Sequence, residues 1–147
     1  MARFHKIVNV STGQETLIQY TPEEEAAEDY ISVEGLHLYN SSTRKELING
    51  SASINVGSRE IPVWIDSESR GSMTALVLAA QLNPTLSTVW KGSDGNFYTL
   101  TTSEIINLGL NAMGYVDTLF TVESTVAAKI VNSTITTTAQ IDTEYSS

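Results

Sequence analysis

The sequence predicts an α+β fold in which short hairpins pack on two to three helices, with a long C-terminal amphipathic helix and an extended N-terminal segment. Three observations favour this class. Runs of β-branched and aromatic residues flank turn residues, helix starts carry capping residues, and apolar residues recur every three or four positions between residues 105 and 126. The 147-residue chain suits a single domain and contains no cysteine, so disulfides are excluded.

The N-terminal segment begins with two predicted strands, at residues 4–10 and 15–20, which flank a loop at residues 11–14. A helix start follows, because Thr21 can cap the helix and Pro22 suits its first position. We expect this acidic helix to cover about residues 22–30, with its carboxylates near the positive end of the helix dipole.

A second helical piece is expected at residues 42–48, since the signals between residues 31 and 39 are mixed. Residues 51–65 then predict a hairpin in which isoleucine and valine alternate with polar residues across a two-residue turn that begins with Gly57. Pro62 cannot donate to a ladder, so its strand lies at a sheet edge or its missing donor points outward, and Trp64 faces away from the apolar row.

A helix with cap candidates at residues 66–69 is predicted to run to about Leu82, where Asn83 and Pro84 end it. A third hairpin follows, with strands at residues 87–90 and 96–100 around a glycine-containing turn.

The last helix has the most complete start signal in the chain. Thr101 and Glu104 form a capping box, and Leu100 and Ile105 form a hydrophobic staple. The apolar stripe that follows resembles a heptad seam over about three heptads and is the candidate assembly face. Its members are Ile105, Leu108, Ala112, Tyr115, Leu119, Val122 and Val126.

A second stripe on the same helix contains Leu110, Met113 and Phe120, so the apolar face is wider than a two-stranded seam requires. Gly109 and Gly114 each cost on the order of 1 kcal/mol inside a helix, which predicts close approach of a neighbouring backbone. From about residue 132 the chain is rich in threonine and serine, and we expect an extended tail over residues 133–147.

Charge and hydropathy limit the partners. The formal net charge of −9 repels nucleic-acid phosphates, so no nucleic-acid partner is expected. No apolar run approaches the roughly 20 residues of a membrane helix, and the first residues lack the apolar core of a signal peptide. We expect synthesis in the cytoplasm and no membrane insertion.

The sequence contains none of the common catalytic motifs. His5 and His37 have no neighbouring metal-ligand motif, and no phosphate-binding loop or nucleophile elbow occurs. Glu60 and Asp66 are separated by about 20 Å along a strand, which is too far for a glycosidase pair. The sequence therefore predicts no catalytic residue, no metal and no cofactor.

Three aromatic residues are candidates for either the core or a partner surface: Trp64, Trp90 and Tyr98. Trp90 and Tyr98 cluster with Phe97 on the third hairpin. Such a cluster can close a small core between sheet and helix, stack on sugars or anchor a protein partner. Asp94 and Asn96 suit a turn whose side chains bond the local backbone.

An ordered set of motifs over about residues 44–132 resembles a small domain family of unknown function encoded in phage and prophage tail regions. The motifs are a helix, a hairpin and an Asp-x-x-Ser helix start, then a tryptophan, an Asp-Asn turn and a Leu-Thr helix start. In this chain they occupy residues 44–50, 54–58, 64–70, 90, 94–96 and 100–104. Gly95 is inserted in the Asp-Asn turn. The N-terminal part, which ends in residues 20–27, is similar to openings of tail-fibre and tail-fibre-assembly proteins.

The resemblance implies a bacteriophage tail context: a docking segment at residues 1–43, a tail-associated domain at residues 44–132, and the extended tail at residues 133–147. We expect a non-enzymatic structural component of the virion tail, in a fibre, fibre link or baseplate. It would be made in the host cytoplasm, bind other phage tail proteins and form a homo-oligomer, with a trimer favoured. A fibre-assembly chaperone and a receptor-binding tip using Trp90 and Tyr98 are the alternatives, and a small hydrolase is the enzyme alternative.

Overall fold

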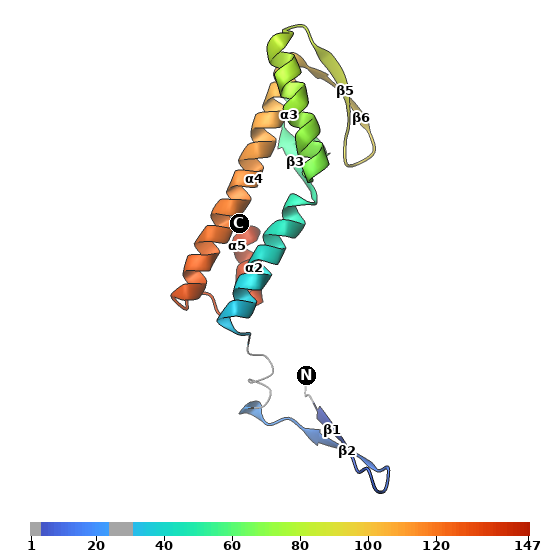
Figure 1. Cartoon of the computed structure of the whole chain (residues 1–147), viewed down its shortest axis with the longest axis vertical. Helices are drawn as coiled ribbons and strands as arrows, with labels where there is room; N and C mark the ends of the chain where they lie inside the picture. The colour runs from blue at the N-terminus through green and yellow to red at the C-terminus, as the bar shows by residue number, and fades with distance from the viewer. Residues whose placement is uncertain (1–3, 24–30) are drawn as a thin grey trace. The chain divides into compact units, whose positions relative to one another are not determined.

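The computed structural model describes residues 4–23 and 31–147 and separates into two units, Met1–Ser32 and Val33–Ser147. The predicted α+β class is confirmed, because the described residues form four helices and three antiparallel strand pairs (Figure 1). Each unit is described by itself below.

The first unit contains the predicted N-terminal hairpin. Strand β1 (Phe4–Val8) pairs with β2 (Glu15–Gln19). Asn9 ends β1 early, because its side-chain oxygen accepts hydrogen bonds from the backbone N–H groups of Ser11 and Thr12. The helix predicted at 22–30 begins at residues 22 and 23, and the rest of that prediction lies outside the described residues.

The second unit is organised around α4 (Thr102–Val131), the long helix that the capping box predicted. Helix α3 (Ser67–Leu82) packs along the first part of α4, and α2 (Val33–Ile48) packs along its later part (Figure 1). A further helix, α5 (Thr138–Tyr145), packs against both α2 and α4. The N-cap of α3 is Asp66, whose carboxylate accepts a 2.9 Å bond from the Ser69 N–H.

Two hairpins complete this unit, and both were predicted. Strand β3 (Ser51–Asn55) pairs with β4 (Glu60–Trp64), and β5 (Ser87–Lys91) pairs with β6 (Phe97–Thr101). The hairpins are joined by a 2.9 Å hydrogen bond from the Ser93 N–H to the carbonyl of Pro62.

The core consists of two apolar clusters. The larger lies where both hairpins and α3 cover α4, and its fully buried residues include Ile61, Val63, Ile65, Leu100, Ile105 and Leu108. The smaller lies between α2, α5 and the end of α4, and consists of Leu36, Val126, Ile130, Ile135 and Ile141.

The smaller cluster corrects two expectations. Helix α2 starts at Val33 rather than near residue 42, because burial of Leu36 outweighs the weak helix propensity of that stretch. The boundary predicted between residues 43 and 44 therefore falls inside a helix. The segment expected to be an extended tail instead forms α5, which begins with a capping box between Thr137 and Gln140 and buries Ile141.

Candidate assembly surface

The stripe predicted as the assembly face of α4 lies inside the chain's own core. Of its seven residues, Ile105, Leu108, Ala112, Leu119 and Val126 are buried. Tyr115 and Val122 are half-buried and pack against the two clusters. These side chains are covered by the hairpins and by the other helices, so a partner must use a different face of α4.

That different face contains the second stripe of the sequence. Leu110, Met113 and Phe120 have 64%, 53% and 48% of their surface exposed, and Val131 at the end of the helix has 74% exposed. Asp117, Ser124 and Ala127 continue the spacing of three and four residues between them. We call this set the outer stripe: Leu110, Met113, Asp117, Phe120, Ser124, Ala127 and Val131.

A shallow groove between α3 and α4 adjoins the start of the outer stripe. It has a volume of about 190 Å³, with Val77 of α3 and Leu110 and Met113 of α4 among its lining residues. The helices approach closely here because Gly109 has no side chain; a Cβ at this position would overlap the Val77 side chain. The neighbour at Gly109 is therefore the Val77 side chain and not the backbone that the sequence predicted, and Gly114 has open space beside it.

A polar clasp of four residues joins α2, α4 and α5. Asn40 is 1% exposed, and its amide donates a 2.9 Å bond to the carbonyl of Glu123. The Tyr145 hydroxyl donates to the side-chain oxygen of Asn40 at 2.8 Å. The Arg44 Nε pairs with the Glu123 carboxylate at 2.7 Å.

Burial, followed by the charge of Glu123, raises the pKa of Tyr145 to about 12, so the hydroxyl remains a donor at neutral pH. Every member of the clasp is bonded to another member. The clasp therefore holds α5 against α2 and α4.

The aromatic candidates divide between core and surface. Trp90 and Tyr98 face each other across the β5–β6 pair and pack against the larger cluster, as the core interpretation predicts. The Tyr98 hydroxyl donates a 2.6 Å bond to Asp94, and this bond lowers the pKa of the Asp94 carboxyl. Trp64 is 48% exposed and faces away from the apolar row, as predicted, and Phe97 is 70% exposed.

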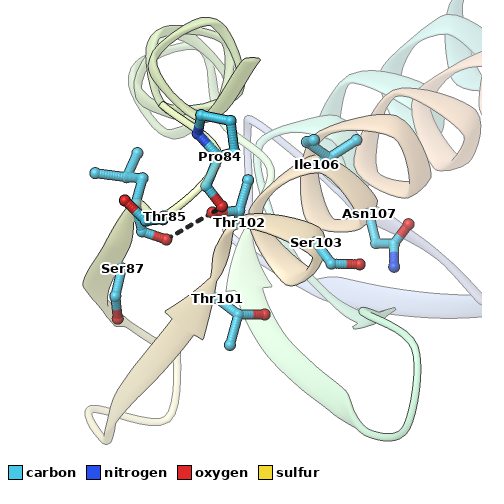
Figure 2. Close-up of a pocket in the computed structure, with 9 residues that line it drawn as sticks. Pro84, Thr85, Ser87, Thr101, Thr102, Ser103, Ile106 and Asn107 are labelled. Carbon is cyan, nitrogen blue, oxygen red and sulfur yellow. Dashed lines mark hydrogen bonds between the residues drawn. The ribbon is translucent and has the colours of Figure 1, made fainter. Parts of the chain in front are cut away.

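The hollow at the start of α4 is lined by threonine and serine residues together with the apolar residues Pro84, Leu86 and Ile106. Its volume is about 610 Å³, and Figure 2 shows Thr85, Ser87, Thr101 and Ser103 around it. The Thr102 hydroxyl is occupied, because it lies 2.9 Å from the carbonyl of Pro84 and 2.8 Å from that of Leu86.

The carboxylate nearest in sequence to this hollow is that of Glu104. It accepts a 3.0 Å bond from the Thr101 N–H and pairs with Arg59 at 2.9 Å. These contacts lower its pKa, chiefly through the Thr101 backbone bond and secondarily through Arg59. A lowered pKa and two bound partners suit a helix cap and ion pair, not a general base.

In the N-terminal hairpin, taken by itself, every apolar side chain described in the two strands is exposed. Phe4, Ile7, Val8, Leu17 and Ile18 are all about half exposed or more. An isolated two-stranded hairpin is marginally stable in water, so this hairpin suits a segment that docks on another surface.

The described parts of the chain bear on two further features, metal-ligand clusters and membrane-spanning helices. Over residues 4–23 and 31–147, histidine and acidic side chains form no cluster of three that could hold a metal ion. None of the helices described there is both long and apolar enough to cross a bilayer.

Two members of the clasp, Asn40 and Tyr145, were not anticipated from the sequence. Asn40 lies in a stretch with mixed helix signals, and Tyr145 lies in the segment expected to be extended. The Thr137-x-x-Gln140 pattern was the signal that could have located α5 and, with it, Tyr145.

Comparison with known proteins places the chain in a family without assigning an activity. Residues 40–145 match the family described as Domain of unknown function (DUF4376), and the chain belongs to that family. Neither a curated protein nor a solved structure matches the chain.

Proposed function

We propose that this member of the DUF4376 family is a non-enzymatic structural component of a bacteriophage tail that acts through protein–protein assembly. Its place would be the virion tail, in a fibre, fibre link or baseplate, after synthesis in the host cytoplasm. The phage context comes from the sequence resemblance to tail-region proteins, and the assembly role comes from the surface of α4.

The observation that supports assembly is the outer stripe. Soluble monomers mostly expose apolar residues singly, whereas several large apolar residues exposed along one helix are typical of an interface. Leu110, Met113 and Phe120 are about half exposed or more although the core beneath them is complete. Leu110 and Met113 line the groove beside α3, and Phe120 lies under Arg44. The exposed part of each side chain is the part that a partner would cover.

The N-terminal hairpin would provide a second contact, to another tail protein. Its strands expose apolar side chains that include Phe4 and Leu17, and its Lys6–Glu15 ion pair lies at the surface. Such a hairpin can bind a partner either by adding a strand to the partner's sheet or by packing its apolar side chains on the partner's surface.

The receptor-binding alternative receives less support from the structure. Trp90 and Tyr98 both pack on the larger cluster, so their ring surfaces are partly used inside the chain. Sugar stacking would need those ring faces exposed.

Mass spectrometry of purified virions tests the proposal. The protein should be present at a fixed ratio to a known tail protein, and a host cytoplasmic protein should be absent from the same preparation. Presence in infected-cell lysate together with absence from virions would instead favour the assembly chaperone. A tail preparation from a phage that lacks the gene should show missing or shortened fibres under either assembly role.

A further inference from the structure

One arginine in the groove between α3 and α4 lacks the carboxylate partner that the other described arginines have. Arg44 pairs with Glu123 at 2.7 Å, and Arg59 pairs with Glu104 at 2.9 Å. Arg70 forms no side-chain hydrogen bond or ion pair with the residues that the structure describes, and its buried Nε has no acceptor. A buried donor without an acceptor is unfavourable. In a chain with 17 acidic and 8 basic residues, this cation is therefore left for a group from outside the chain.

The walls of the groove around Arg70 are mostly apolar. Met73 is 3% exposed and forms part of the base, whereas Leu110 and Met113 are half exposed or more and form part of the rim. Arg70 precedes Val77, where α3 comes closest to Gly109, by seven residues, or about 10 Å of helix. The groove thus offers a positive charge at one end and an apolar surface along the rest.

We propose that this groove binds the C-terminal residue of a partner polypeptide, with its carboxylate on Arg70 and its aliphatic side chain between Leu110 and Met113. This inference rests on the proposed assembly role and identifies the partner by the chemistry of its chain end. The planar guanidinium matches the two oxygens of a carboxylate. Methionine side chains adapt readily to the shape of an apolar ligand.

The size of the groove favours a single residue. Its volume of about 190 Å³ is below the roughly 300 Å³ at which pockets for drug-sized ligands begin. It equals the liquid volume of about six water molecules, which is close to a leucine side chain with its carboxylate. A chain end brings one backbone segment to the groove, whereas an internal residue brings two.

Charge separates the chain end from other protein occupants. A purely apolar surface laid over the groove would bury the Arg70 cation further without giving it an acceptor, which is costly. The other polar residue of the lining, Thr74, already donates its hydroxyl to the Arg70 carbonyl at 2.9 Å. An internal aspartate or glutamate would supply the charge but carries no apolar group beyond it for the remaining walls.

Fluorescence anisotropy with the full-length chain tests the proposal. The probe is a fluorescein-labelled pentapeptide, GSGSL, made once with a free C-terminal carboxylate and once as the C-terminal amide. The free acid should bind saturably, and the amide at least about tenfold more weakly, because it loses the charge-assisted bonds to Arg70. The free acid of GSGSS, which lacks the aliphatic side chain, should also bind at least about tenfold more weakly.

Matched variants assign the binding to the groove. Arg70→Gln should remove the difference between the acid and the amide, whereas Lys45→Gln makes the same change of charge at an exposed, unpaired lysine of α2 and should not. Leu110→Ser should weaken both peptides, whereas Leu78→Ser, exposed on α3 outside the groove, should weaken neither. Circular dichroism checks that each variant is folded. If Arg70→Gln does not fold, the acid and amide on the wild-type chain decide the same point.

Equal affinity for the acid and the amide would overturn the inference, as would no binding of the acid at concentrations up to about 1 mM. Arg70-dependent binding of sodium hexanoate without binding of the peptide would also overturn it, because the occupant would then be a free acid and not a chain end. A chain that binds no peptide but is found in virions would leave the proposed function standing, so the two failures are distinguishable.

Discussion

Replacing Asn40 by aspartate would convert the polar clasp into a pH-dependent defect. The new carboxylate keeps the acceptor for the Tyr145 hydroxyl, but its second oxygen faces the Glu123 carbonyl, which is 2.9 Å from the amide nitrogen it replaces. Two acceptors then face each other at a site that is 1% exposed. Protonation of the carboxyl restores a donor, so the fold favours the neutral form and the folded pKa is raised.

The magnitude follows from that shift. A rise of about 2 units above the unfolded value of about 3.9 corresponds to about 2.7 kcal/mol. The penalty is complete above the folded pKa and decreases as the pH falls through it toward the unfolded value. Relative to wild type, Asn40→Asp should lose about 2.7 kcal/mol at about pH 7.5 and about 1.5 kcal/mol at about pH 5.

Urea unfolding of both chains at the two pH values measures this difference. Asn40→Leu is the control, because it fills the space and loses the same amide donor without adding a charge. Its deficit, on the order of 1–2 kcal/mol, should be equal at both pH values. An Asn40→Asp deficit that does not change with pH would refute the clasp as a buried site and would indicate that water reaches Asn40.

Three further predictions concern packing, capping and ionisation. Gly109→Ala should lower the free energy of unfolding by about 1–3 kcal/mol, because its methyl group overlaps Val77. The control Gly114→Ala, in open space, should raise the free energy of unfolding by up to about 1 kcal/mol. Equal thermal shifts for the two variants would contradict the packing argument. Glu104→Gln should be less stable than wild type at neutral pH and should approach wild-type stability in acid. The lowered pKa of Glu104 stabilises the fold at pH values above its pKa in the unfolded chain, and this contribution is lost as the pH falls through its pKa in the folded chain. Parallel pH–stability curves for the two chains would exclude this contribution of Glu104. Tyr145→Phe should lose less stability than wild type as the pH rises from about 10 to about 12, because the raised pKa of Tyr145 disfavours its ionisation in the fold. The difference between the spectroscopic titrations of the two chains measures the pKa of the Tyr145 phenol.

The elements that the sequence predicted well are those whose signals are local. The capping box of Thr101 and Glu104 depends on residues three positions apart, and the hairpin turn at Gly57 depends on a positive φ of 121° that glycine tolerates. Both are properties of a few neighbouring residues, so spacing alone was sufficient to locate them.

The parts that escaped prediction depend on residues far apart in the chain. Helix α2 extends to Val33 because Leu36 packs on the end of α4, and Asn40 is buried because it bonds Glu123, 83 positions away. For the candidate site, the helix was identified correctly but its faces could not be assigned. Apolar spacing does not show which stripe of the helix the hairpins cover. In the structure, the stripe that contains Leu108 is the one buried in the larger cluster.

The bond between the two hairpins also limits which strand edges are open to another chain. Pro62 has no N–H to offer a neighbouring strand, and its carbonyl is already bonded to Ser93. The outer edge of β4 is therefore closed to another chain at its centre, which is one of the ways that proteins prevent sheets from growing into aggregates. The N-terminal hairpin, a sheet of only two strands in the described residues, has no such proline within β1 or β2. That hairpin also exposes the apolar side chains of both strands, so its removal should improve solubility.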